Sequence, residues 1–244
     1  MMNAQLDFSL LEQMTEHVRL GLASVRRTIE SASTAPERIT IIGVTKGWGP
    51  EAVLAGLANG LVWFGENYAD ELVAKAAAVQ LALSEGVPLD DFPSPVPNPM
   101  WTFQGRLQTN KINRLKELVQ LWQTLDTQHH VTALATRVPG AEVLVQVALD
   151  PSGDRGGCPD EQVLELVLTA RNAGLRVSGL MGVAPDISVH GMHAASSAFA
   201  KLQHLAGELS LPVISMGMSD DYGLALASGA THLRLGSVLF GSRT

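Results

Sequence analysis

The stretch Ile39-Thr40-Ile41-Ile42-Gly43-Val44-Thr45-Lys46 predicts a β-strand that ends in a lysine. Apolar and β-branched residues occupy both faces of this strand, which is typical of a parallel strand covered on both sides. A lysine seldom lies in such a setting without a partner or a task. Partial desolvation lowers the pKa of an amine, and the neutral amine can attack an aldehyde to form a Schiff base. The alternative is a solvated lysine just past a strand end, and this segment alone does not separate the two.

Strand-like segments alternate with helical segments along the rest of the chain. Predicted strands lie at residues 39–45, 61–65, 100–105, 121–126, 142–149, 176–182, 212–216 and 231–235. Helical patterns lie between most of them, at residues 50–58, 68–84, 111–118, 128–136, 160–173, 192–209 and 220–227. Eight strand–helix units predict a closed (β/α)8 barrel, the TIM-barrel fold, with a parallel sheet. An open doubly wound sheet is the alternative if one or two of these strands are wrong.

An amphipathic helix precedes the first strand. Its apolar residues recur at steps of three and four, and they are Leu11, Met14, Val18, Leu22, Val25 and Ile29. Because little of the chain follows the eighth strand, we expect this helix to cover barrel surface that a full eighth helix would otherwise cover. The expectation is a single barrel domain over residues 1–244, with the proline-rich stretch 83–99 as a solvated loop.

The composition indicates a soluble, cytoplasmic protein. The net charge of −7 gives no general attraction to nucleic acid or to anionic membranes. No segment has the uninterrupted apolar length that spans a bilayer, and the first helix does not have the pattern of a signal peptide. The single cysteine, Cys158, excludes an internal disulfide and fits a reducing compartment. No trio of histidine, cysteine or acidic residues has metal-ligand spacing, so we predict no metal.

Glycines and hydroxyl residues gather where the last two predicted strands end, the barrel face on which functional residues lie. Gly217 and Gly236 would let the backbone approach an anion, while Ser215, Ser219 and Ser237 would offer hydroxyl groups. A helical turn beginning near Gly236 would add unpaired N–H donors and the positive end of a helix dipole. Two such turns after the seventh and eighth strands predict a phosphate site, whereas an ordinary strand-to-helix turn is the alternative.

Arg234 lies in the apolar strand segment Leu233-Arg234-Leu235. A buried arginine requires an acceptor because it cannot shed its charge. One option is a structural carboxylate. The other is a ring nitrogen of a heteroaromatic cofactor, to which the guanidinium would donate.

Six blocks of the chain resemble one known family, in the same order. They are VTK (44–46), FGENY (64–68), WTFQGRLQTNK (101–111), GLM (179–181), SMGMSDD (215–221) and RLGSVLFGSR (234–243). The family is that of the pyridoxal-phosphate homeostasis proteins, called YggS in bacteria and PROSC in vertebrates. The resemblance runs from about residue 39 to the C-terminus, and the SMGMSDD string is its most specific block.

The resemblance implies a single barrel domain like the cofactor domain of alanine racemase. It implies that Lys46 holds pyridoxal 5′-phosphate (PLP) as an internal aldimine, with Asn67 beside the cofactor ring and Arg234 facing the pyridine nitrogen. It also implies a phosphate held by Ser215, Ser219, Gly236 and Ser237. The predicted cofactor-binding set is therefore Lys46, Asn67, Ser215, Met216, Gly217, Ser219, Arg234, Gly236 and Ser237.

The chain departs from the family pattern at the predicted rim of the site. The third block carries Thr102 and Gln104 where the family usually has histidine and isoleucine, and residues 153–158 read GDRGGC where a lysine and a glycine are usual. These changes leave the predicted cofactor contacts intact and concern the rim and any partner contact there. A basic helical face formed by Lys111, Arg114 and Lys116 is predicted to be solvated and to have no effect on cofactor content.

Arg234 also bears on whether the chain is an enzyme. PLP is the strongest electron sink when its ring nitrogen is protonated, and a facing arginine disfavours that proton. Arg234 therefore argues against demanding carbanion chemistry, although racemases of the same barrel class work with an arginine there. The leading hypothesis is a monomer that stores, delivers or buffers PLP without turnover, with PLP-requiring apo-enzymes as recipients. A small PLP-dependent amino-acid racemase is the first alternative, with Tyr68 or Tyr222 as its second acid–base group. The second alternative is a lyase that uses Lys46 directly on a sugar phosphate, which leaves Asn67 and Arg234 unexplained.

Overall fold

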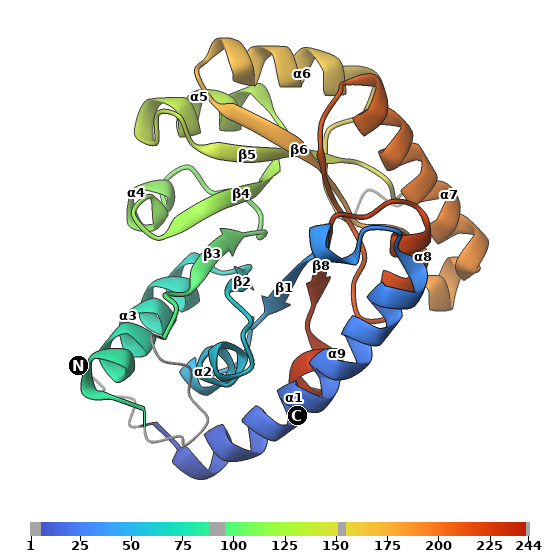
Figure 1. The fold of residues 1–244 in the computed structure, drawn as a ribbon. Helices are drawn as coiled ribbons and strands as arrows, with labels where there is room; N and C mark the ends of the chain where they lie inside the picture. The colour runs from blue at the N-terminus through green and yellow to red at the C-terminus, as the bar shows by residue number, and fades with distance from the viewer. Residues whose placement is uncertain (1–5, 88–95, 151–154, 243–244) are drawn as a thin grey trace.

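The computed structural model describes residues 6–87, 96–150 and 155–242. Eight parallel strands pair in chain order, and β1 closes the barrel by pairing with β8 (Figure 1). The strands are β1 (Thr40–Val44), β2 (Trp63–Glu66), β3 (Met100–Phe103), β4 (Val119–Leu125), β5 (Glu142–Val147), β6 (Arg176–Gly182), β7 (Val213–Ser215) and β8 (His232–Leu235). The (β/α)8 prediction is confirmed, and each predicted strand end lies within two residues of the observed one.

The helices lie outside the barrel, as the right-handed crossover between parallel strands requires. They are α1 (Phe8–Ala32), the short 3-10 helix η1 (Pro36–Arg38), α2 (Pro50–Ala58), α3 (Ala69–Glu85), α4 (Ile112–Leu115), α5 (Gln128–Arg137), α6 (Asp160–Asn172), α7 (Ile187–Glu208), α8 (Tyr222–Ala227) and α9 (Ser237–Phe240). The turn predicted near Gly236 is α9, for which Gly236 is the N-cap.

Two predicted helices differ from the observed ones. The helix predicted over 111–118 is a single turn, because β4 begins at Val119 and the chain must reverse before it. The helix predicted from residue 192 begins at Ile187, where Asp186 caps it by accepting a hydrogen bond from the Ser188 N–H at 2.8 Å. Gly191 interrupts this helix with a φ of 78°. Only residues 187–190 precede the interruption, and a segment that short shows no helical pattern in the sequence.

Helix α1 covers the barrel where the chain closes. It packs against α2, α8 and the short α9, as Figure 1 shows. The six residues that predicted its apolar face are its buried residues, namely Leu11, Met14, Val18, Leu22, Val25 and Ile29. The prediction that α1 replaces a full eighth helix is confirmed.

The predicted loop at 83–99 begins later than expected, because α3 extends to Glu85. Residues 88–95 of that loop lie outside the described residues. Among the helices of the described ranges, none is both long enough and apolar enough to cross a bilayer.

Candidate functional site

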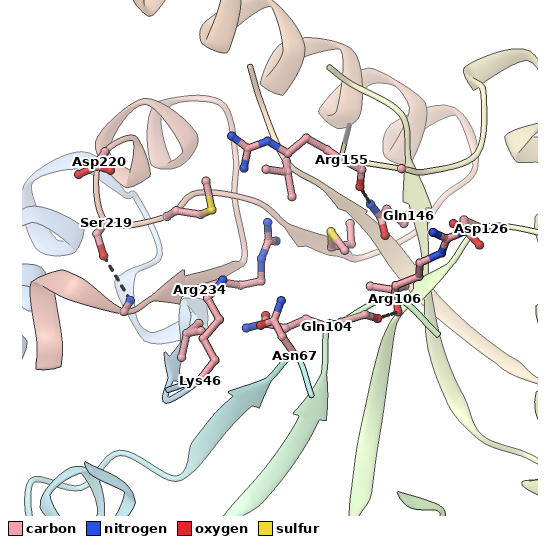
Figure 2. A pocket seen from close by; sticks show the side chains of 18 of the residues that line it. Lys46, Asn67, Gln104, Arg106, Asp126, Gln146, Arg155, Ser219, Asp220 and Arg234 are labelled. Carbon is pink, nitrogen blue, oxygen red and sulfur yellow. Dashed lines mark hydrogen bonds between the residues drawn. The ribbon is translucent and has the colours of Figure 1, made fainter. Parts of the chain in front are cut away.

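A cavity of about 620 Å³ lies at the ends of the barrel strands (Figure 2). Six of the nine predicted cofactor-binding residues line it, namely Lys46, Asn67, Ser219, Arg234, Gly236 and Ser237. The other three, Ser215, Met216 and Gly217, are not among its lining residues. The cavity therefore brings together residues from β1, β2, β8 and the turn after β7.

Lys46 and Asn67 are placed by neighbouring strands. Each follows its strand by one or two residues, and β1 pairs with β2 in parallel, so both side chains emerge at the same edge. Figure 2 shows them close to Arg234 on one side of the cavity. Gly105 lies against Asn67 so closely that a Cβ atom there would be 1.8 Å from the Asn67 carbonyl oxygen. Only glycine fits this approach between the ends of β2 and β3.

A buried ion pair lies beside Lys46. The Lys75 ammonium on α3 is 2.5 Å from Glu66 Oε1, and both side chains are almost fully buried. Thr45 donates its hydroxyl proton to the same carboxylate oxygen at 2.6 Å. Burial raises the pKa of the Glu66 carboxyl, and the Lys75 charge and the two hydrogen bonds only partly oppose that effect. The sequence reasoning did not identify this pair, although Glu66 ends an otherwise apolar strand.

Arg234 is buried inside the barrel and bonded on two sides. Its Nη1 donates to Ser215 Oγ at 2.9 Å, and its Nη2 donates to the Gly182 carbonyl at 2.8 Å. Ser215 in turn donates to Gln123 Oε1 at 2.7 Å, and Gln123 Nε2 donates to Thr102 Oγ1 at 2.6 Å. Burial lowers the pKa of Arg234 to about 10, with the Asp221 charge opposing, so the side chain is a cation at neutral pH. The acceptors of Arg234 in the protein are thus a hydroxyl and a backbone carbonyl, and not the structural carboxylate that was one of the two predicted options.

The turn after β7 is bonded to the turn after β8. Ser219 Oγ accepts hydrogen bonds from the backbone N–H groups of Gly236 and Val238, both at 3.2 Å. Gly217 has a φ of 91°, the left-handed region that glycine favours. Met216, which was predicted to bind the cofactor, is fully buried and does not line the cavity.

The opposite wall of the cavity carries polar residues that were not predicted as binding residues. Gln146 Nε2 donates to the Arg155 carbonyl at 2.8 Å, and Asp126 Oδ1 lies 2.6 Å from His130 Nδ1. Gln104 also lines the cavity, and its side chain lies over Gly65, where a Cβ would be 2.7 Å from Gln104 Nε2. Gln104 and the segment that contains Arg155 depart from the family pattern, and these departures are the signal in the sequence for this wall.

Neither tyrosine lines this cavity. The Tyr222 hydroxyl lies 3.4 Å from Thr28 Oγ1 and thus contacts α1. Tyr68 is 63% exposed and borders a separate, smaller cavity. The geometry gives neither residue a position beside Lys46.

Two further residue classes bear on the chemistry. Cys158 is buried, and burial raises the pKa of its thiol to about 11, so it stays protonated and unreactive at neutral pH. Within the described part of the chain, no group of three or more histidine, cysteine or acidic residues is arranged to hold a metal ion.

The chain matches a family model, curated relatives and solved structures over most of its length. The family model described as alanine racemase, N-terminal domain, matches residues 20–244. A Pseudomonas aeruginosa protein named pyridoxal phosphate homeostasis protein is 31% identical over 241 residues, which cover 96% of this chain and 97% of the relative. The structure of PipY from Synechococcus elongatus PCC7942 with PLP bound has a TM-score of 0.75 at 27% identity, covering 92% of this chain and 100% of PipY. An unknown protein from Bifidobacterium adolescentis, with a TM-score of 0.83 and 22% identity over 97% of this chain and 98% of its own, supports the fold alone.

Proposed function

This chain belongs to the pyridoxal phosphate homeostasis proteins, built on the alanine racemase N-terminal domain, and from that premise we propose that it binds PLP. The observation that carries the proposal is the meeting of Lys46, Asn67 and Arg234 with the Ser219–Gly236 turn in one cavity. The proposed role is to hold PLP for intracellular vitamin B6 homeostasis.

The residues of the cavity fit the chemical groups of PLP. Its aldehyde needs an amine, and Lys46 lies half-buried in the cavity wall. Its phosphate needs donors, and the cavity wall contains the Ser219 and Ser237 hydroxyls beside Gly236. Among the residues that line the cavity, the buried side-chain oxygens of Asn67 and Gln104 also lack a hydrogen-bond partner within the described residues. Because such orphaned atoms are costly, a polar ligand that pairs with them would stabilise the site.

Bound PLP supplies an aldehyde that combines with amines and a ring that accepts electrons. We propose that Lys46 binds the aldehyde and that Arg234 lies toward the ring nitrogen. Ser215 and the Gly182 carbonyl hold the Arg234 guanidinium, which stays charged at neutral pH. A fixed cation there disfavours a proton on the ring nitrogen, so it supports binding without turnover. The positions of Tyr68 and Tyr222 outside the cavity support the same proposal over a racemase.

The finer parts of the proposal concern the context of binding. We propose that residues 1–244 form one domain, and that the protein acts as a cytoplasmic monomer. We further propose that PLP-requiring apo-enzymes receive the cofactor from it. The single cysteine supports the cytoplasmic part of this proposal, because it fits a reducing compartment.

Borohydride trapping tests the binding proposal. The purified protein is incubated with PLP, its visible spectrum is recorded, and the reduced protein is digested for peptide mapping. We expect a yellow protein with its label on Lys46 and no label in Lys46→Ala. Lys111→Ala is the control and should be labelled normally, because Lys111 pairs with Asp70 outside the cavity. A wild-type protein that stays colourless and unlabelled would overturn the proposal.

Isotope exchange tests the absence of turnover. A panel of amino acids is incubated with the PLP-loaded protein in deuterated water, and exchange at the α-carbon is followed by NMR. We expect no exchange above that of free PLP. Exchange at an enzymatic rate that disappears in Lys46→Ala would establish the racemase alternative instead.

A further inference from the structure

We propose that the ion cluster of Glu66, Glu71 and Lys75 is a positioning device, which fixes the backbone on both sides of Lys46 so that its amine meets the aldehyde. Glu66 and Lys75 are buried, and the Glu71 side chain is 25% exposed. This inference rests on the proposed function, and it assigns a role to residues that the cofactor cavity itself does not use. Glu71 and Lys75 lie one turn apart on α3, and Glu66 ends β2.

Lys75 is the centre of the cluster. Its side chain is 3% exposed, and its ammonium donates to Glu66 Oε1 at 2.5 Å, to the Thr45 carbonyl at 2.6 Å and to Glu71 Oε1 at 2.9 Å. An ammonium has three N–H bonds, so these three acceptors use its full capacity. The direction of the Lys75 side chain is therefore fixed by all its partners together.

The cluster reaches both peptide groups that flank Lys46. The Thr45 carbonyl belongs to the peptide bond before Lys46, and Lys75 binds it. The Gly47 N–H belongs to the peptide bond after Lys46, and it donates to Glu71 Oε1 at 2.6 Å. Gly47 has a φ of 75°, which turns the chain after this contact. With both peptide planes held, the backbone angles of Lys46 are fixed, and the origin of its side chain with them.

The energetics favour a role beyond stability. A buried ion pair adds little net stability, because the desolvation of two charges offsets their attraction. This cluster also leaves Glu66 Oε2 buried without a partner in the described residues. An apolar contact between α3 and β2 would avoid that cost, but it could not bind a carbonyl and an N–H group. What the ions provide is control of the two peptide groups around Lys46.

A second ion cluster on the same helix provides the matched control. Asp70, the neighbour of Glu71, pairs with Lys111 at 3.0 Å and with Arg114, and all three side chains are partly or largely exposed. This second cluster links α3 to the segment around α4, whereas the first cluster contacts the backbone beside Lys46. Asp70→Asn therefore disturbs an ion cluster of α3 and leaves the Lys46 backbone unchanged.

The test compares Glu71→Ala, Glu71→Gln and Asp70→Asn with the wild-type protein. In the protein without PLP, hydrogen exchange of the Gly47 amide is measured by NMR. We expect Glu71→Ala to speed this exchange about tenfold or more, because the amide loses its acceptor. Glu71→Gln keeps an acceptor oxygen and should restore most of the protection, and Asp70→Asn should match the wild type.

The same variants are then mixed with PLP, and the growth of visible absorbance is followed. We expect Glu71→Ala to react on the order of ten to a hundred times more slowly, because small displacements of a reacting group have effects of this size. Glu71→Gln should retain most of the rate. If Glu71→Ala does not fold, Lys75→Arg replaces it, since a planar guanidinium cannot reproduce the three contacts. That variant is also expected to slow the reaction.

The outcomes separate this inference from the proposed function. If the wild type forms no Lys46-linked product, the proposed function fails, and the positioning role falls with it. If the wild type and Asp70→Asn react normally and Glu71→Ala reacts equally fast, only the positioning role is overturned. Loss of thermal stability in Glu71→Ala with an unchanged Gly47 exchange rate and reaction rate would show that the cluster is merely structural.

Discussion

Two buried polar networks support the two sides of the candidate site, and they hold their residues in different ways. The network around Lys75 binds the peptide groups on either side of Lys46. The network through Gln123 and Ser215 binds the Arg234 side chain itself at its guanidinium. The first network therefore fixes the backbone from which the Lys46 side chain extends, and the second fixes the guanidinium group of Arg234.

The difference suits the proposed chemistry of each residue. A lysine that binds an aldehyde must move its amine through an attack and a release, so its backbone is the part to fix. An arginine that faces a ring does not move, and a fixed charge acts electrostatically without reorganisation. The two networks also differ in composition, because the lysine side joins three ionisable side chains and the arginine side has one cation among neutral partners.

The largest expected effect follows from breaking the ionic network. Lys75→Met leaves Glu66 as a buried carboxylate without its cation, so we expect a loss of about 3–5 kcal/mol in the free energy of unfolding near neutral pH. Urea unfolding measures it. The double variant Glu66→Gln/Lys75→Met removes both charges and should recover most of that loss. A single variant within about 1 kcal/mol of the wild type would mean that the pair is not desolvated as the structure indicates.

The next largest effect concerns acid pH, at which His232 and Glu66 change the stability with opposite signs. Burial and the Arg234 charge lower the pKa of His232, which starts β8, to about 4, with the Glu142 charge opposing. Between that value and the ordinary 6.5, the unfolded chain binds a proton that the folded chain does not. The stability contribution of His232 is therefore full above pH 6.5 and is lost as the pH falls toward 4.

Glu66 titrates in the other direction. Its raised pKa means that the folded chain binds a proton there more tightly than the unfolded chain does. This contribution is full below the ordinary carboxyl value and is lost as the pH rises through the raised one. On acidification His232 thus lowers the stability while Glu66 raises it.

Unfolding free energies measured across this range separate the two groups. His232→Asn should remove up to about 3 kcal/mol of the acid-side loss, and Asn can still bond the Thr231 hydroxyl, which lies 2.9 Å from the His232 ring. Glu66→Gln should instead make the acid-side loss steeper. If the free energy of unfolding depends on pH in the same way in His232→Asn and in the wild type, His232 is not the source of the acid-side loss.

The sequence predicted the architecture well because the barrel depends on local patterns. The apolar strand 39–45 and the six-residue stripe of α1 each predict one element, and each element is present. The α1 stripe is buried as predicted, whereas β1 is buried at its last three residues and partly buried at its first two. The end of the first strand predicted Lys46 as a site residue, and the family resemblance implied that Asn67 and Arg234 lie beside it. All three line one cavity. Membership of the family was also predicted, from six short blocks of sequence.

The supporting networks could not be predicted, because their partners are far apart in the sequence. Gln123 meets Ser215 across 92 positions, and Lys75 meets the Thr45 carbonyl across 30. Neither pairing has a pattern that one strand or one helix can reveal. Ser215 is the example with consequences, because it was predicted to hold the phosphate as part of the SMGMSDD block, whereas its hydroxyl is bonded to Gln123 and Arg234.

The smallest expected effect decides which role Ser215 has. Ser215→Ala leaves Gln123 Oε1 and one Arg234 N–H without their partner, so we expect a loss of about 1–3 kcal/mol in the free energy of unfolding. Binding of PLP and of pyridoxal, which lacks the phosphate, then separates the two roles. A residue that acts through Arg234 should weaken both ligands by a similar factor. A residue that holds the phosphate should weaken PLP alone.

Ser219→Ala is the matched control for that comparison. Ser219 lines the cavity, and its hydroxyl holds the Gly236 and Val238 amides, so its loss should weaken PLP far more than pyridoxal. If Ser215→Ala also weakens PLP far more than pyridoxal, Ser215 contacts the phosphate as well as Arg234. The Arg234 network would then hold the ligand directly, in addition to fixing a side chain. If it weakens both ligands equally, Ser215 belongs with Gln123 and Thr102 as support for a fixed cation. The phosphate would then depend on the turns after β7 and β8.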